Sequence, residues 1–359
     1  MSTATRGTDR FPSARVDSAA LIHNLEVARR HAGGEGLWAV VKADAYGHGL
    51  IPVARVLAPR VEGLAVARLG EAEALRRAGF DGRILLLEGV FSRRGRSRAA
   101  ILGLDLVFHD PEQLHLLPVV NRAWLKVDTG MHRLGFAPEA VPEALARLQA
   151  GAQGPVGLLS HLADADDPGD PYTRLQVRRF HALAGAGERP LSLANSAGLL
   201  GHPDARIGWA RPGIMLYGAS PFAGETGGDR GLRPVMTLEA PLIAVRHLAA
   251  GEPVGYGGTY RCPEAMPVGV VGIGYGDGYP RHVPNGTPVL LDGVEVPLLG
   301  RVSMDMLCVD LRPCPGARPG ARAVLWGEGL PVERVAAAAG TLAYELLCRV
   351  APRVRREYL

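Results

Sequence analysis

Two lysines stand out in a chain of 359 residues that otherwise carries its positive charge on arginine. Lysine and arginine together number 40, and the only lysines are Lys42, in AVVKADAYGHG, and Lys126, in LKVDTGMHRLG. Arginine keeps its proton in proteins, whereas a lysine made neutral by burial or by a nearby cation is a nucleophilic amine. These two lysines could therefore serve covalent chemistry through their nitrogen atoms. Alternatively, they could be surface residues that remain by chance. Composition alone favours chance, so the position of each lysine in the fold must decide.

Short apolar segments alternate with helical segments between residues 20 and 215. The segments that read as strands buried on both faces are 37–42, 63–67, 83–88, 104–108, 123–128, 156–161, 191–195 and, more weakly, 205–213. Helical patterns lie between several of them, such as residues 69–80, where Gly79 is a candidate C-cap. Eight such units predict an α/β fold, an N-terminal (β/α)8 TIM-like barrel. A doubly wound open sheet is the competing fold.

The pattern changes at the polar, glycine-rich stretch GASPFAGETGGDRGLRP, residues 218–234. Beyond it, short strand-like runs are separated by proline, glycine and Asn-Gly, which is typical of a mostly β domain. We therefore divide the chain into a barrel domain, residues 1–230, and a C-terminal mostly-β domain, residues 231–359.

Composition excludes several classes of function. The net charge of +4, with 47% hydrophobic and 21% charged residues, is typical of a soluble globular protein. The arginine-rich run at residues 91–98 reads as a solvated loop or helix and not as a nucleic-acid site. The four cysteines form no C-x-x-C pair, so we expect neither a zinc site nor a disulfide framework. No apolar signal segment or membrane-spanning run is present, and we expect a cytoplasmic protein.

Polar residues cluster where the predicted barrel strands end, which is where barrel enzymes build their sites. Lys42 ends the first strand, and Lys126 lies near the end of the fifth. The other residues at such ends are Asp128, His161, Asn195, Ser196, Arg211 and Gly213. Both lysines thus fall at the predicted site, which weakens the chance reading. A lone His161 would more often be a core residue, but in this set we interpret it as lining the site.

Eight segments, in order along the chain, resemble those of the alanine racemase family. They are AVVKADAYGHG, LKVDTGMHRLG, LSHLADAD, ANSAG, RPGIMLYG, VGYGGTY, IGYGDGYPR and GRVSMDM. One segment is moderately specific, whereas eight in order across both domains are very specific. The family combines a barrel and a β domain in a head-to-tail homodimer. The resemblance implies an isomerase that interconverts L- and D-alanine with pyridoxal 5'-phosphate, supplying D-alanine for peptidoglycan.

The resemblance assigns cofactor contacts residue by residue. Lys42 would attach pyridoxal phosphate through its amine, which must be neutral to react. Arg211 would donate to the pyridine nitrogen and discourage its protonation, and His161 would hydrogen-bond Arg211. The remaining cofactor-binding residues would be Tyr46, Asn195 and Ser196, with the backbone N–H groups of Gly213 and Ile214.

The resemblance also implies two catalytic bases, Lys42 and a Tyr256 delivered by the partner subunit. In many members the residue matching Lys126 carries a carbamate, which would pair with Arg133 and aim it at the cofactor and the substrate carboxylate. A plain structural Lys126 facing Asp128 is the alternative. The substrate would further contact Tyr275, the backbone N–H of Met304 and a loop supported by Asp305.

Two positions depart from the family, and three other functions compete. Ser192 stands where some members have a histidine, which puts in doubt the hydrogen bonds behind Arg211. Pro352 stands where some have a tyrosine that touches the phosphate. A Schiff-base aldolase would not need the β domain, and a non-catalytic cofactor-binding protein would resemble the barrel alone. A pyridoxal-phosphate decarboxylase would be expected to have an acidic residue in place of Arg211.

Overall fold

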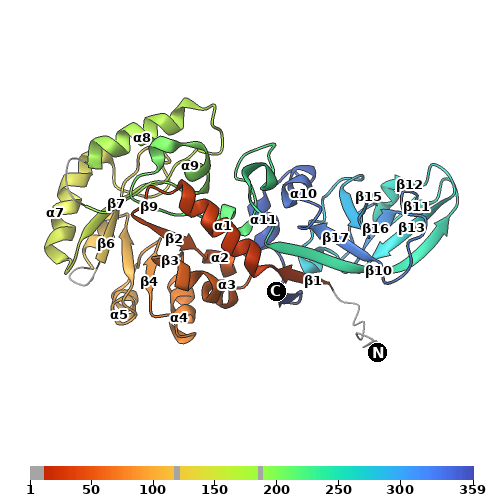
Figure 1. The fold of residues 1–359 in the computed structure, drawn as a ribbon, viewed down its shortest axis with the longest axis horizontal. Helices are drawn as coiled ribbons and strands as arrows, with labels where there is room; N and C mark the ends of the chain where they lie inside the picture. The colour runs from red at the N-terminus through yellow and green to blue at the C-terminus, as the bar shows by residue number, and fades with distance from the viewer. Residues whose placement is uncertain (1–11, 117–121, 185–188) are drawn as a thin grey trace. The chain divides into compact units, whose positions relative to one another are not determined.

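The computed structural model describes residues 12–116, 122–184 and 189–359. They form two compact units (Figure 1). The barrel unit is Ser18–Arg233, and the β unit combines the described residues up to Asp17 with Pro234–Leu359. None of the helices in these ranges is long and apolar enough to cross a membrane.

Eight parallel strands of the barrel unit pair in the order β8-β7-β6-β5-β4-β3-β2-β9. An antiparallel bridge between Ser192 and Gly208 joins β8 to the residue before β9, so the sheet closes on itself. Gly208 has a φ of 61°, and a Cβ there would lie 2.1 Å from the carbonyl oxygen of Leu191, so glycine is required at this closure. The predicted barrel is thereby confirmed. Its strands are β2 Gly36–Val40, β3 Gly63–Val66, β4 Arg83–Leu86, β5 Asp105–Phe108, β6 Arg122–Lys126, β7 Val156–Leu159, β8 Leu191–Ser192 and β9 Trp209–Ala210.

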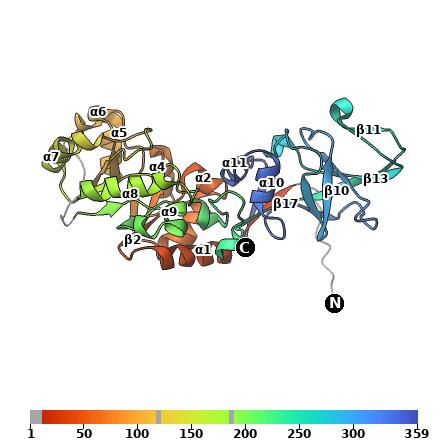
Figure 2. The ribbon, with the colours of Figure 1, turned by 90° about the horizontal axis from the view of Figure 1, so that it is seen from above.

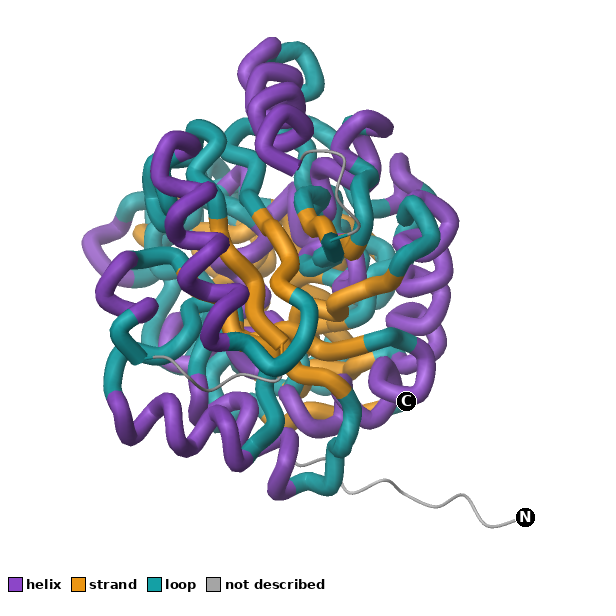
Figure 3. The backbone as a smooth tube through the Cα atoms, turned by 90° about the vertical axis from the view of Figure 1, so that its left-hand side faces the viewer, coloured by secondary structure: helices purple, strands orange, loops and turns teal. Residues whose placement is uncertain are grey.

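Helices connect the strands and lie around them (Figure 3). The predicted helix from residue 69 is α4, and Gly79 follows its C-cap with a φ of 86°. The arginine-rich run forms α5, capped by the Ser92 side chain. The helices are α1 Ser18–His31, α2 Lys42–Tyr46, α3 Leu50–Leu57, α4 Leu69–Arg77, α5 Arg93–Ile101, α6 Pro111–Leu114, α7 Val141–Gly151, α8 Pro171–Ala184 and α9 Ser196–Gly201.

Tryptophans fill the interior of the barrel below the strand ends. The ring of Trp38, on β2, lies 6.3 Å from that of Trp124, on β6, although these strands are not neighbours in the sheet. The two rings therefore meet across the barrel, and Trp209 packs 4.8 Å from Trp38. Side chains alternate along a strand, so Trp124 shares a face with Lys126. The tryptophans thus form the floor beneath the predicted site.

The β unit is built around the long strand β10 Met236–Leu248, which pairs with β17 along its first half and with β13 along its second. The strands β13, β16, β15, β14, β17 and β10 close into a ring, and β1 and β18 extend the sheet from β10. The predicted mostly-β C-terminal fold is confirmed. Its strands are β1 Ser13–Val16, β11 Pro253–Val254, β12 Tyr260–Arg261, β13 Met266–Val271, β14 Pro288–Leu291, β15 Val294–Leu299, β16 Leu307–Asp310, β17 Arg322–Trp326 and β18 Arg355–Tyr358.

Two features of the β unit are absent from the sequence analysis. Strand β1, from the N-terminal end of the chain, pairs antiparallel with β10 and parallel with β18. Two short helices, α10 Val332–Ala338 and α11 Ala343–Cys348, precede β18. Helix α10 buries Val332 and Val335 in a run that is otherwise mostly alanine, which gives a weak helical pattern.

Candidate active site

Lys42 opens a left-handed turn, which is a rare conformation for residues other than glycine. Residues 43–46 all have φ between 52° and 54°, and each costs roughly 1–2 kcal/mol in this region. One distant carboxylate and one carboxylate of the turn itself accept backbone hydrogen bonds that hold it. The Glu71 carboxylate accepts from the Ala43 N–H at 2.7 Å, and the Asp44 carboxylate accepts from the Leu50 N–H at 2.7 Å. Strain of this kind, supported by the surroundings, is concentrated at functional sites.

The left-handed turn brings Tyr46 to the strand ends of β8 and β9. A Cβ on Gly213 would lie 2.4 Å from the Tyr46 hydroxyl, so only glycine lets the backbone approach this hydroxyl so closely. The Ser196 hydroxyl accepts from the Gly213 N–H at 2.9 Å. The N–H of Ile214, at the start of a 3-10 turn, makes no hydrogen bond to any described residue. We call these four residues, Tyr46, Ser196, Gly213 and Ile214, the β8–β9 cradle.

Asn195 precedes Ser196 of the β8–β9 cradle and fixes its position through a helix cap. Its side-chain oxygen accepts from the Gly198 N–H at 2.8 Å and so caps α9, which begins at Ser196. This bond fixes the start of the helix. Asn195 therefore orients Ser196, and its predicted contact with the cofactor stays a prediction.

Four cations lie at the strand ends next to the β8–β9 cradle: Lys42, Lys126, Arg133 and Arg211. Within the described residues, none of them forms an ion pair with a carboxylate. Burial, followed by the charges of the other three, lowers the pKa of Lys126 to about 8. Burial and the same four charges lower the pKa of His161 well below its ordinary value, so this histidine is neutral. The arrangement is an excess of positive charge that favours anions.

Asp128 follows Lys126 by two residues, but its carboxylate has other partners. It accepts from the N–H groups of Gly130 and His132 at 2.9 and 3.1 Å, and it pairs with the His132 ring at 3.0 Å. Burial raises its pKa, but the hydrogen bonds from His132 and Gly130 outweigh this effect and keep the pKa low. No ion pair with Lys126 is present among the described residues.

Arg211 is held by neutral acceptors. One Nη donates to the Ser192 hydroxyl, and the other donates to the carbonyl oxygens of Ser160 and Leu193. Burial lowers the pKa of Arg211 to about 10, so the side chain remains a cation at neutral pH. Ser192, which departs from the family pattern, therefore supports Arg211 directly. The expected hydrogen bond between Arg211 and His161 is not formed in the described part of the chain.

A buried hydrogen-bond network behind these residues was missed by the sequence analysis. The hydroxyls of Thr129 and Ser160 lie 2.8 Å apart, and Ser160 donates to the Val127 carbonyl at 2.7 Å. Gln176, on α8, donates to Thr129 at 3.3 Å and to the backbone oxygen of His161 at 3.1 Å. The network thus ties the ends of β6 and β7 to α8. A glutamine within a helical pattern carries no signal of this role.

Tyr256 lies in the β unit, between the paired strands β11 and β12. Strand β11 of this hairpin is labelled in Figure 2. Glycines on both sides allow the turn, because Gly255, Gly257 and Gly258 all have φ between 54° and 72°. The side chain is 66% exposed within the chain. The hairpin therefore presents a phenol outward, and Tyr256 is no packing residue.

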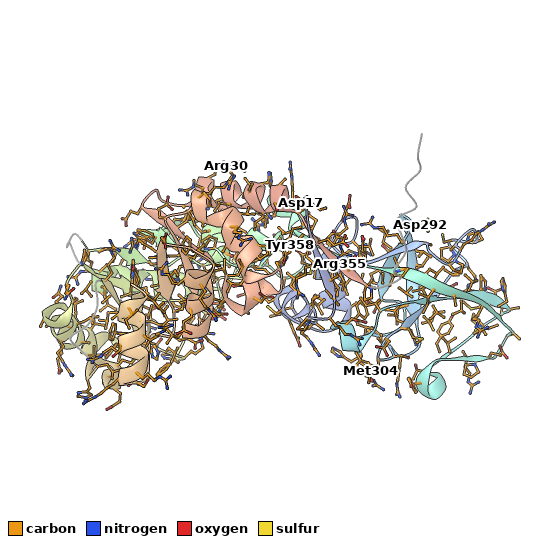
Figure 4. All side chains as sticks on the ribbon, turned by 90° about the horizontal axis from the view of Figure 1, so that it is seen from below. Asp17, Arg30, Asp292, Met304, Arg355 and Tyr358 are labelled. Carbon is orange, nitrogen blue, oxygen red and sulfur yellow. The ribbon has the colours of Figure 1, made fainter. Side chains whose placement is uncertain are left out.

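Tyr275, Met304 and Asp305 come together on one face of the β unit. The Tyr275 N–H donates to the Ser303 carbonyl at 3.0 Å, and the Gly276 N–H donates to the Met304 carbonyl at 2.8 Å. Met304 lies at the surface (Figure 4) and is 53% exposed. The predicted site residues thus form two groups, one on each unit.

Comparison with known proteins gives the same family for both units. The model of the alanine racemase N-terminal domain matches residues 16–221, and that of the alanine racemase C-terminal domain matches residues 235–358. The chain belongs to the alanine racemase family. The resemblance noted in the eight segments is confirmed, and with it the expectation of a racemase of the isomerase class at the level of the family.

Relatives of this family match the chain over nearly its full length. The alanine racemase of Halorhodospira halophila is 51% identical, over 99% of this chain and 98% of its own. The alanine racemase of Nitrosococcus oceani is also 51% identical, over 96% and 99%. The crystal structure of biosynthetic alanine racemase from Pseudomonas aeruginosa superimposes with a TM-score of 0.94 at 46% identity, covering 98% of this chain and 99% of that one. The structure of alanine racemase from Bartonella henselae contains covalently bound pyridoxal phosphate, with a TM-score of 0.87 at 28% identity, covering 97% and 99%.

Proposed function

We propose that this protein interconverts L-alanine and D-alanine with pyridoxal phosphate attached to Lys42. The observation that carries the proposal is the group of four cations beside the β8–β9 cradle, without a carboxylate partner among the described residues. Such a site requires several anionic groups at once. A cofactor phosphate, a cofactor phenolate and a substrate carboxylate would supply them.

The residues fit the cofactor one group at a time. The phosphate would occupy the β8–β9 cradle, where the Ile214 N–H has no hydrogen-bond partner among the described residues and Gly213 lacks a side chain. The amine of Lys42, at the head of the left-handed turn, would bind the cofactor covalently. Arg211 would face the pyridine nitrogen as a cation, because its acceptors are neutral and its pKa of about 10 keeps it protonated.

When bound, pyridoxal phosphate acidifies the α hydrogen of an amino acid by withdrawing electrons from the α carbon. A racemase must then remove the proton from one face of that carbon and return one to the other face. Lys42 serves the face next to its own barrel. We assign the opposite face to Tyr256, whose hairpin presents the phenol outward.

Delivery of Tyr256 from a partner subunit explains why this phenol is exposed in a single chain. In a two-fold dimer, the same contact is made twice, so each barrel can receive the hairpin of the other protomer. We therefore propose a homodimer with two shared sites. Each site would contain one Lys42 and the partner's Tyr256.

Lys126 would carry a carbamate. A lysine must be neutral to react with carbon dioxide, and a pKa of about 8 leaves roughly a tenth of the amine neutral at pH 7. The product is an anion, and it would pair with Arg133, which has no carboxylate partner among the described residues. Arg133 would thereby be aimed at the cofactor phenolate and the substrate carboxylate.

The β unit of the partner subunit would contribute the rest of the substrate site. The N–H groups of Met304 and Asp305 make no hydrogen bonds to described residues, and they would donate to the substrate carboxylate. Tyr275 would limit the size of the substrate side chain. Alanine is the proposed substrate, and D-alanine for peptidoglycan in the cytoplasm is the proposed use.

The test is direct. The purified protein is incubated with pyridoxal phosphate and single L-amino acids, and D-amino acid formation is followed by chiral chromatography. We expect racemisation of L-alanine and its abolition in Lys42→Ala, with Arg122→Met as a control that removes an exposed cation of the same unit. Absence of D-alanine with the wild-type protein would rule out the proposed function.

A further inference from the structure

Arg353 joins two loops of the β unit through a single guanidinium group. Its Nε donates to Oδ1 of Asp277 at 2.8 Å, and its Nη2 donates to Oδ1 of Asp305 at 2.7 Å. Asp277 follows Tyr275 in the turn Tyr275–Asp277, and Asp305 follows Met304. One side chain from the C-terminal segment therefore bridges the two loops that hold the proposed substrate contacts.

The surroundings of Arg353 are shaped to accept it. A Cβ on Gly276 would lie 2.6 Å from Nη2 of Arg353, so a residue larger than glycine would push the guanidinium away. Asp277 is only 4% exposed, and its second oxygen accepts from the Gly274 N–H at 2.9 Å. The Asp277 carbonyl accepts from the Ala351 N–H at 2.9 Å, which anchors the segment that carries Arg353.

The two loops are also joined by backbone hydrogen bonds, so the part that remains for Arg353 to hold is Asp305. The N–H groups of Tyr275 and Gly276 already donate to the carbonyls of Ser303 and Met304. These bonds fix the carbonyl side of the Met304 loop. The N–H groups of Met304 and Asp305 are free with respect to the described residues. Asp305 is 57% exposed at its side chain, and Arg353 holds it there.

We propose that Arg353 is a positioning residue that orients the free N–H groups of Met304 and Asp305 toward the substrate carboxylate. This inference rests on the function proposed above. The planar guanidinium matters, because its Nε and Nη2 reach two carboxylates in a fixed geometry, whereas a lysine ammonium is a single point of charge. Since Arg353 itself is half exposed, its ion pairs contribute little to global stability.

The experiment compares the holoenzyme with Arg353→Gln, Arg353→Lys and the control Arg349→Gln. Arg349 lies in the same C-terminal segment and pairs with Glu345 at 2.9 Å. Among the described residues, its side chain forms no hydrogen bond or ion pair with either loop. Steady-state kinetics give kcat and KM for L-alanine, and propionate, a carboxylate without an amine, gives an inhibition constant. Hydrogen exchange of residues 274–278 and 301–306 is measured on the same proteins.

We expect Arg353→Gln to raise the KM for alanine and the inhibition constant of propionate together, by about tenfold, while kcat changes by less than about twofold. Arg353→Lys should not restore either constant, because it cannot bridge both carboxylates. Exchange in both loops should accelerate in the Arg353 variants and stay at the wild-type rate in Arg349→Gln.

Two results overturn the proposal. Faster exchange with unchanged KM and propionate inhibition would make Arg353 a purely structural bridge. Unchanged exchange would mean that Arg353 does not hold the loops. Failure of the proposed function gives a different result, because the wild-type protein would then not racemise alanine. Hydrogen exchange would still show whether Arg353 holds the two loops in place.

Discussion

Lys126→Met should stabilise the cofactor-free protein, and the gain should depend on pH. Burial and three neighbouring cations lower the pKa of Lys126 from 10.5 to about 8. This difference corresponds to about 3 kcal/mol of unfavourable free energy when the amine is protonated in the folded state. Methionine has a similar length and no charge, so it removes the penalty while keeping most of the packing.

The sign and the pH window follow from the two pKa values. Between pH 8 and 10.5 the unfolded chain holds a proton on Lys126 that the folded chain has lost, so wild-type stability rises with pH there. The penalty is full below the folded pKa and absent above the unfolded one. The advantage of Lys126→Met should therefore be about 3 kcal/mol at pH 7 and about 1 kcal/mol at pH 10.

Urea unfolding in buffers free of carbon dioxide measures this difference. Arg122→Met is the matched control, because it removes an exposed cation from the same strand, β6. Added bicarbonate should stabilise the wild type near pH 7 and leave Lys126→Met unchanged, because only the lysine can form a carbamate. Equal effects of Lys126→Met at pH 7 and pH 10, or an effect no larger than that of the control, would refute the reasoning.

Three further predictions concern the site itself. Mixing inactive Lys42→Ala and Tyr256→Phe under subunit exchange should restore roughly a quarter of wild-type activity; no recovery would place both groups in one chain. Arg211→Glu should racemise more slowly and form more pyridoxamine phosphate, because a carboxylate lets the pyridine nitrogen keep a proton; an unchanged yield by chromatography contradicts this role. Gly213→Ala should weaken binding of pyridoxal phosphate at least about tenfold in a fluorescence titration, because its Cβ would lie 2.4 Å from the Tyr46 hydroxyl. The control Gly70→Ala meets nothing within 4 Å and should bind as the wild type does.

Barrel strands were predictable because they are short apolar runs, and their ends follow from where those runs stop. Lys126 falls at the last residue of β6, and Lys42 comes two residues after β2, so the carboxyl-end rule for barrels placed both lysines correctly in the fold. The arginine-rich helix α5 was recognisable as a solvated element because only Ala99 of its nine residues is buried.

The left-handed turn and the roles of several polar side chains could not be predicted, because they depend on tertiary contacts. Asp tolerates the left-handed region as a single residue, but local propensity opposes four such residues in succession in Ala-Asp-Ala-Tyr. The turn depends on Glu71, which accepts a hydrogen bond from Ala43, 28 residues earlier in the chain. The buried Gln176 and the bridging Arg353 are similar cases, because ordinary polar residues acquire their roles only from partners distant in sequence.

Reduction of the holoenzyme with borohydride tests the central claim most directly, because it fixes the cofactor to the amine that carries it. The chain offers two lysines and the N-terminal amine as sites. After reduction and digestion, mass spectrometry locates the pyridoxyl group. The account predicts that it is found on Lys42 in the wild type and lost in Lys42→Ala, with Lys126 unlabelled. A pyridoxyl group on Lys126, or no labelled peptide from a protein that still racemises alanine, would contradict the account.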